Sequence, residues 1–116
     1  MTTRTLNFAF AVSLLGLFLV SCDQPQKISA INADPGSFHN KTVNIAGEVT
    51  QSIGALGKGV YMISDGTGSL WVYSDKLGVP TKGAKVGVKG TVLPSFTFLG
   101  TNYATVVKES DRQAAK

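Results

Sequence analysis

Residues 41–52, "KTVNIAGEVTQS", and residues 84–95, "AKVGVKGTVLPS", carry one pattern twice, and this pattern decides the fold. In both segments apolar side chains occupy alternate positions, which predicts a β-strand with one buried face. The third of the four inward positions is a glycine in each copy, Gly47 and Gly90. A glycine inside a strand indicates a bulge, a sharp bend or the close approach of another backbone. Chance similarity between two half-buried strands is the alternative interpretation.

The same reasoning, extended outward from these segments, predicts further strands and one helix. "DGTG" (residues 65–68) lies between two β-rich runs and is a strong hairpin signal. Ile28 and Ile31 predict a two-turn helix that residues 34–36 end. Residues 94–100, "PSFTFLG", are expected to form a loop that holds two aromatic side chains. The expected strands cover residues 42–51, 60–64, 69–74, 85–93 and 101–108.

Short strands with frequent glycines and little helix are typical of a small all-β barrel or sandwich. The repeated pattern favours the barrel, because an inward glycine lets one strand bend enough to serve two sheets. We therefore predict an all-β, five-stranded barrel with a short N-terminal helix, in which Gly47 and Gly90 lie at the bends. A valine at either position is expected to destabilise the fold by about 1–3 kcal/mol through overpacking.

The first residues have the layout of an export signal. Arg4 precedes an uncharged apolar run over residues 8–20, and this run is shorter than the roughly 20 residues of a membrane-spanning helix. The run leads into "LVSC" (residues 19–22), which resembles the lipobox of bacterial lipoproteins, where the cysteine is lipidated. A buried core helix and an ordinary signal peptide cut elsewhere are the alternatives.

Cys22 is the only cysteine, so no disulfide can form within the chain, and lipidation accounts for a lone thiol in an exported protein. We predict attachment to a membrane through a lipid on Cys22, in the bacterial cell envelope and facing the periplasm or the exterior. Asp23 resembles the inner-membrane retention signal of Gram-negative lipoproteins. The expected domains are a lipoprotein signal peptide (1–21), the lipidated cysteine and tether (22–27), the folded domain (28–109) and a charged tail (110–116).

The composition and the motifs point away from catalysis. The net charge of +4 gives modest support for an anionic partner. His39 is the only histidine, no GxxxxGK[ST] phosphate loop occurs, and Asp65 lacks the further spaced acids of a calcium loop. Asp65 is better explained as the cap of its own turn. We therefore expect a protein that is not an enzyme and has no catalytic residues, metal site or cofactor.

Three segments in this order resemble OB-fold domains of the type related to anticodon-binding domains. They are "FHNKTVNIAGEV" (38–49), "VYMISDGTGSLWVYS" (60–74) and "TKGAKVGVKGTV" (81–92). The resemblance covers residues 28 to about 109, and its strength lies in the order and spacing of the segments. It implies a ligand surface on the second and third strands, flanked by the one-two and four-five loops.

Trp71 and Tyr73 are expected on that surface, because Leu70 and Val72 alternate with them and point inward. Aromatic rings beside lysines suit the stacking of bases and the attraction of phosphates. The remaining candidate ligand-binding residues are Val60 and Met62 on the second strand, Lys58 in the one-two loop, and Phe96 and Phe98 in the four-five loop.

The sequence departs from the anticodon-binding domains that it resembles at three positions of the second and third strands. It has Val60 where they tend to have an aromatic residue, Ser64 where they have arginine, and Trp71 where they have glutamine. Trp71 and Tyr73 also have the plain alternative of cross-strand packing. The first expectation is therefore a membrane-held, non-catalytic binding module for a protein or other envelope component. The alternative is nucleic-acid or oligosaccharide binding through the same face.

Overall fold

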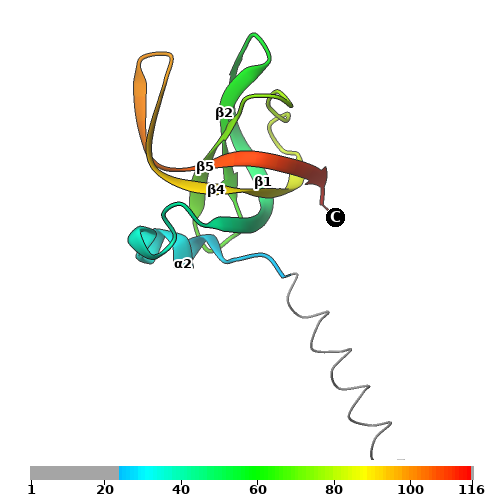
Figure 1. The fold of residues 1–116 in the computed structure, drawn as a ribbon. Coiled ribbons are helices and arrows are strands. Elements are labelled where there is room, and N and C mark those ends of the chain that lie inside the picture. The colour runs from blue at the N-terminus through cyan, green and yellow to red at the C-terminus, as the bar shows by residue number, and fades with distance from the viewer. Residues whose placement is uncertain (1–23, 116) are drawn as a thin grey trace, which may run out of the picture.

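The structure is a computed structural model that describes residues 24–115, so the expected signal peptide, Cys22 and Asp23 lie outside the described residues. Its strands close into a barrel in the order β1-β2-β3-β5-β4 (Figure 1). The prediction of an all-β, five-stranded barrel with a short helix is confirmed. The elements are α2 (Ile28–Ala33), η2 (Pro35–Ser37), β1 (Thr42–Ala55), β2 (Lys58–Ser64), β3 (Ser69–Ser74), β4 (Lys85–Phe98) and β5 (Thr101–Ala114).

Gly47 lies where β1 changes its neighbour. Residues 42–48 pair with β4 and residues 48–55 pair with β2, so one strand serves both sides of the barrel. A Cβ on Gly47 would lie 2.2 Å from the carbonyl oxygen of Ser64, which is backbone. The close approach expected from the sequence is therefore present, and it explains the glycine.

Gly90 has the same role on β4. A Cβ there would lie 2.3 Å from the carbonyl oxygen of Lys108 on β5. The β4–β5 ladder also shifts register between Lys89 and Gly90, as expected of a bulge. The two copies of the pattern thus mark two places where backbones cross too closely for any side chain.

The barrel interior holds the inward residues of all five strands, among them Ile45, Ile63 and Val88. Helix α2 joins this core through Ile28 and Ile31, which are fully buried. In Figure 1 the helix lies at the end of the barrel opposite the β1–β2 and β4–β5 hairpins. Among residues 24–115 there is no helix with the length and apolarity required to cross a membrane.

Asp65 caps its turn as predicted. One carboxylate oxygen accepts hydrogen bonds from the backbone and hydroxyl of Thr67 and from the Gly68 amide. The other accepts one from the Ile28 amide at 2.9 Å, which ties α2 to the β2–β3 turn. Burial would raise the pKa of Asp65, but these hydrogen bonds to the ionised form outweigh it and lower the pKa.

The strands are longer than the sequence predicted, and this corrects two assignments. β4 extends to Phe98, so residues 94–98 belong to a strand instead of a loop. β5 extends to Ala114, where the expected charged tail pairs with β4 from Val86 to Lys89, and the folded domain therefore does not end at 109. Residues 94–98 alternate at Phe96 and Phe98, but Pro94 and Gly100 indicated a loop. Residues 110–114 show no apolar alternation, and only their backbone pairing with β4 makes them a strand.

Candidate binding face

Trp71 and Tyr73 lie on the outer side of β3, as the alternation predicted, because Leu70 and Val72 are buried in the barrel core. They do not form an open surface, however. A second hydrophobic cluster, called here the aromatic cluster, covers this side of the barrel. Its buried members are Val60, Tyr73 and Val106, and packed against them are Trp71, Phe96, Phe98 and Tyr103.

The β4–β5 hairpin supplies the cover. Phe96 and Tyr103 are cross-strand partners, so their side chains share one side of the hairpin. That side contacts β3: the ring centroids of Tyr73 and Phe96 are 4.1 Å apart, and those of Trp71 and Tyr103 are 4.9 Å apart in an edge-on arrangement. Phe98 adds a third contact, with its ring centroid 6.0 Å from that of Tyr73.

The predicted site residues therefore divide into two groups. Val60 and Tyr73 are buried, with exposed fractions of 0% and 9%, so the expectation that they are open to a ligand is wrong in this conformation. Met62 and Trp71 are half-buried and face each other across the β2–β3 ladder. Lys58 is exposed and is the first residue of β2, instead of a loop residue. Phe96 and Phe98 are half-buried strand residues.

Lys108 was not singled out from the sequence, but it adds a positive charge to this face. It pairs with Tyr73 in the parallel β3–β5 ladder and is exposed. Lys58 lies on β2, the strand that carries Met62, and Lys108 lies on β5, which pairs with β3 beside Trp71. The exposed leucines Leu56 and Leu99 lie at the tips of the β1–β2 and β4–β5 hairpins, and a third exposed leucine, Leu77, lies in the β3–β4 connection.

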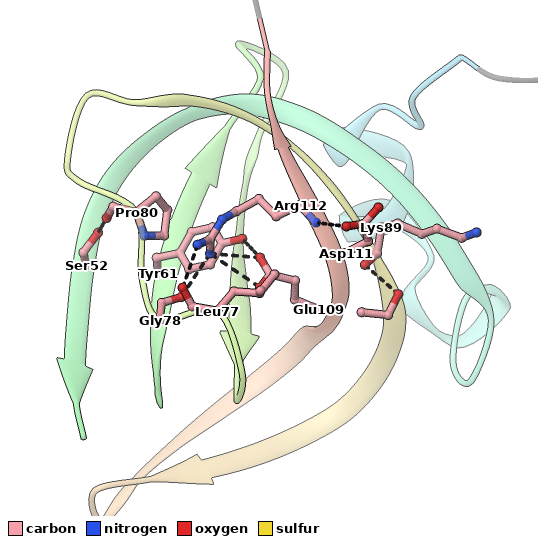
Figure 2. Close-up of polar contacts among 10 residues, drawn as sticks. Ser52, Tyr61, Leu77, Gly78, Pro80, Lys89, Glu109, Asp111 and Arg112 are labelled. Carbon is pink, nitrogen blue, oxygen red and sulfur yellow. Dashed lines mark hydrogen bonds and ion pairs between the residues drawn. The ribbon is translucent and has the colours of Figure 1, made fainter. Parts of the chain in front are cut away.

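A buried polar network, which sequence reasoning missed, lies on the other side of β2 (Figure 2). The Tyr61 hydroxyl donates a hydrogen bond to Glu109 Oε1, and Arg112 Nη1 forms an ion pair with the same oxygen at 3.1 Å. Arg112 also donates to the carbonyl oxygens of Leu77 and Gly78 at 3.1 and 3.0 Å. Its guanidinium carbon lies 5.6 Å from the centroid of the Tyr61 ring. The network therefore fastens β5 and the β3–β4 connection to the core.

Burial, with the hydrogen bond to Glu109 and its negative charge, raises the pKa of Tyr61 well above its usual value, although Arg112 opposes the shift. The unfolded chain releases this proton near pH 10, so the stability that depends on it is complete below that pH and is lost as the pH rises further. We expect the free energy of unfolding to fall by about 1.4 kcal/mol more per pH unit above pH 10 in the wild type than in Tyr61→Phe. Urea titrations between pH 8 and 11 measure this difference, and parallel curves would contradict it.

No group of three or more His, Cys, Asp or Glu side chains between residues 24 and 115 is placed to hold a metal ion. In the described part of the chain, three hollows are lined by residues outside the aromatic cluster, one of them, of about 290 Å³, beside Gly47 and Asp65. One of about 430 Å³ is lined by residues of β1, β4 and β5, and one of about 360 Å³ lies beside Glu109 and Lys76.

Comparison with known proteins supports the fold. No protein-family model matches the sequence, and no curated protein matches it. The barrel is similar to asparaginyl-tRNA synthetase from Pyrococcus horikoshii complexed with asparaginyl-adenylate, with a TM-score of 0.63 and 19% identity over 79% of this chain and 22% of that one. It is also similar to a protein described as an aspartyl-tRNA synthetase from Leishmania major Friedlin, with a TM-score of 0.60 and 15% identity over 79% of this chain and 21% of that one.

A third similar structure is OBody AM3L09 bound to hen egg-white lysozyme, with a TM-score of 0.58 and 17% identity. The match covers 78% of this chain and 94% of the OBody. The chain thus spans about a fifth of each synthetase but nearly the whole OBody. Together with the closed five-stranded barrel, these likenesses define an OB-fold.

Proposed function

We propose that this chain is a non-catalytic OB-fold binding module and that its ligand is a single-stranded nucleic acid. The observation that carries the proposal is the half-buried pair of Met62 and Trp71 on the outer side of β2 and β3, with the exposed Lys58 on β2 and Lys108 on β5. This side of an OB-fold, with its flanking hairpins, is the common docking site for oligonucleotides and oligosaccharides. Aromatic stacking combined with phosphate attraction suits single strands. The likeness to two tRNA synthetases supports the same ligand class.

A filter or fluorescence assay with a fluorescent oligothymidylate of about 12 nucleotides tests this proposal. We expect Trp71→Ala to weaken binding by about 1–3 kcal/mol, the cost of losing one stacked base. We also expect affinity to fall steeply with added salt, because phosphate contacts release counterions. Leu77→Ala, at an exposed apolar residue in the β3–β4 connection, is the matched control. Equal binding by Trp71→Ala and the wild type would contradict the proposed site.

A protein or other envelope component is the second candidate ligand, and two observations favour it. Leu56 is fully exposed and Leu99 is 68% exposed at the hairpin tips, so apolar side chains flank the face. In the OBody complex, a protein that the chain resembles in fold is bound to lysozyme. Binding of a protein through such contacts should depend little on salt, in contrast to binding of nucleic acid.

We further propose that the module is held at a bacterial membrane, the inner membrane in a Gram-negative cell, by a lipid on Cys22. The sequence "LVSC" supports this. The folded domain begins only a few residues after Cys22, which would hold it close to the membrane. The Gln26 amide already donates a hydrogen bond to the Asn44 carbonyl oxygen at 2.7 Å, so the tether after Cys22 is short.

Replacing Cys22 with serine should release the protein from membranes, because the residue that carries the lipid is then absent. Membrane fractionation and fatty-acid labelling measure the change. A Ser21→Ala variant, which keeps a small residue before the cysteine, is expected to remain lipidated and serves as the control. If Cys22→Ser stays in the membrane fraction at an unchanged intact mass, the anchor lies elsewhere.

A further inference from the structure

The part of the β4–β5 hairpin beyond the barrel is joined to it by two unusual residues. Leu93 pairs with Val106 and Ser95 pairs with Ala104, but the intervening Pro94 and Thr105 form no pair in the ladder. Proline has no amide hydrogen to donate. Thr105 has a φ of 52°, in the left-handed region that a β-branched residue strongly disfavours. The ladder is therefore interrupted where Pro94 of β4 lies opposite Thr105 of β5, and the backbone is strained at Thr105.

Beyond that level, residues 95–104 are paired only with each other within the described chain. The pairing of β4 with β1 ends at Thr91, and the pairing of β5 with β3 begins at Val106. In Figure 1 the hairpin stands out from the barrel on the same side as the β1–β2 hairpin. Its side chains Phe96, Phe98 and Tyr103 contact the barrel within the aromatic cluster.

One of these contacts covers Tyr73, which lies two residues from Trp71 on the same side of β3. The rings of Phe96 and Tyr73 are tilted by 36° with their centroids 4.1 Å apart, so the two rings are in direct contact. Tyr73 is only 9% exposed because of this cover. A planar ring of a ligand could stack on Tyr73 only after Phe96 has moved away.

We propose that residues 95–104 form a lid, called here the lid hairpin, which closes over β3 through Phe96 and opens by rotation at Pro94 and Thr105 to admit a nucleobase onto Tyr73. The identity of the ligand rests on the proposed function, whereas the opening of the lid hairpin does not. Strained backbone at a junction of this kind is a common feature of parts that switch between two positions. A closed lid lowers the apparent affinity in proportion to the fraction of open molecules.

The opening is tested without any ligand. Trp71 is the only tryptophan, so acrylamide quenching of its fluorescence reports directly on the cover by Tyr103 and the lid hairpin. We expect Phe96→Ala to raise the quenching constant about twofold. Thr97→Ala, at an exposed residue of the same hairpin, should leave it unchanged. An unchanged constant in a folded Phe96→Ala protein would overturn the proposal.

Hydrogen exchange of the wild-type protein gives an independent measurement that needs no variant. Amides within the lid hairpin should exchange at least about tenfold faster than those of the β1–β4 ladder, because the hairpin opens without unfolding of the barrel. Equal rates would show that the hairpin unfolds only with the barrel, and there would be no lid. This result decides the matter if Phe96→Ala does not fold.

Binding of the oligothymidylate then connects the lid to the ligand. We expect Phe96→Ala to bind about tenfold more tightly than the wild type, because the competing ring is gone. Weaker binding would make Phe96 a ligand contact and would overturn its role as a cover. If neither protein binds the oligothymidylate, the proposed function fails, while quenching and hydrogen exchange still decide whether the lid exists.

Discussion

Gly47→Ala is expected to destabilise the barrel by about 3 kcal/mol, the upper end of the usual overpacking cost. The added Cβ would lie 2.2 Å from the Ser64 carbonyl oxygen and 2.7 Å from its carbonyl carbon. Both atoms are backbone, so no side-chain rotation can relieve the contact. β1 would have to separate from β2 at the residue where it leaves β4, which loosens the closure of the barrel.

Gly90→Ala should have a similar effect, because its Cβ would lie 2.3 Å from the Lys108 carbonyl oxygen. Gly87→Ala is the matched control on the same strand, since its nearest contact would be an ordinary 3.9 Å to the Gln113 side chain. Urea denaturation of the three variants and the wild type measures the difference. A loss in Gly47→Ala no larger than in Gly87→Ala would show that the close approach at β1 does not constrain the fold.

Arg112→Met is expected to destabilise the protein by about 3–5 kcal/mol, the cost of leaving a buried charge without its partner. The Glu109 side chain is 1% exposed, and its ion pair with Arg112 spans 3.1 Å. The Leu77 and Gly78 carbonyl oxygens would also lose the hydrogen bonds that Arg112 donates. The β3–β4 connection should loosen as a result.

A second substitution separates the charge from the packing. Adding Glu109→Gln to Arg112→Met removes the unpaired charge, so the double variant should recover part of the lost stability. Lys89→Met, at an exposed cation on the neighbouring strand, controls for the loss of a positive charge and should change stability little. Denaturation curves for the set provide the measurement. An Arg112→Met protein as stable as the Lys89→Met protein would contradict the role assigned to the network.

Much of the barrel could be predicted from the sequence, because its signals are local. Alternation alone placed Leu70 and Val72 inside and Trp71 and Tyr73 outside, and this assignment is confirmed. The repeated glycine indicated the close crossings, since only a residue without a Cβ fits there. The capping by Asp65 followed from the chemistry of an Asp-Gly turn.

The state of the candidate site depended on contacts between residues far apart in the chain. Alternation shows which side of β3 Tyr73 occupies, but it does not show that Phe96 covers that side. The turns of the β1–β2 and β4–β5 hairpins each have a leucine with positive φ, Leu56 and Leu99, at a position where asparagine or aspartate is usual. The turn residues therefore did not predict where the strands of these two hairpins end.

The sequence by itself determined the number of strands, their inward faces and the two crossings, because each depends on neighbouring residues and on the absence of one Cβ. Tertiary structure alone decided that residues 110–114 pair with β4, that Glu109 and Arg112 meet Tyr61, and that the predicted ligand face is covered. In each of these cases the partner lies on a strand remote in sequence. The backbone pairing and burial of these residues depend on closure of the barrel, and a local sequence pattern does not predict which remote residues closure brings together.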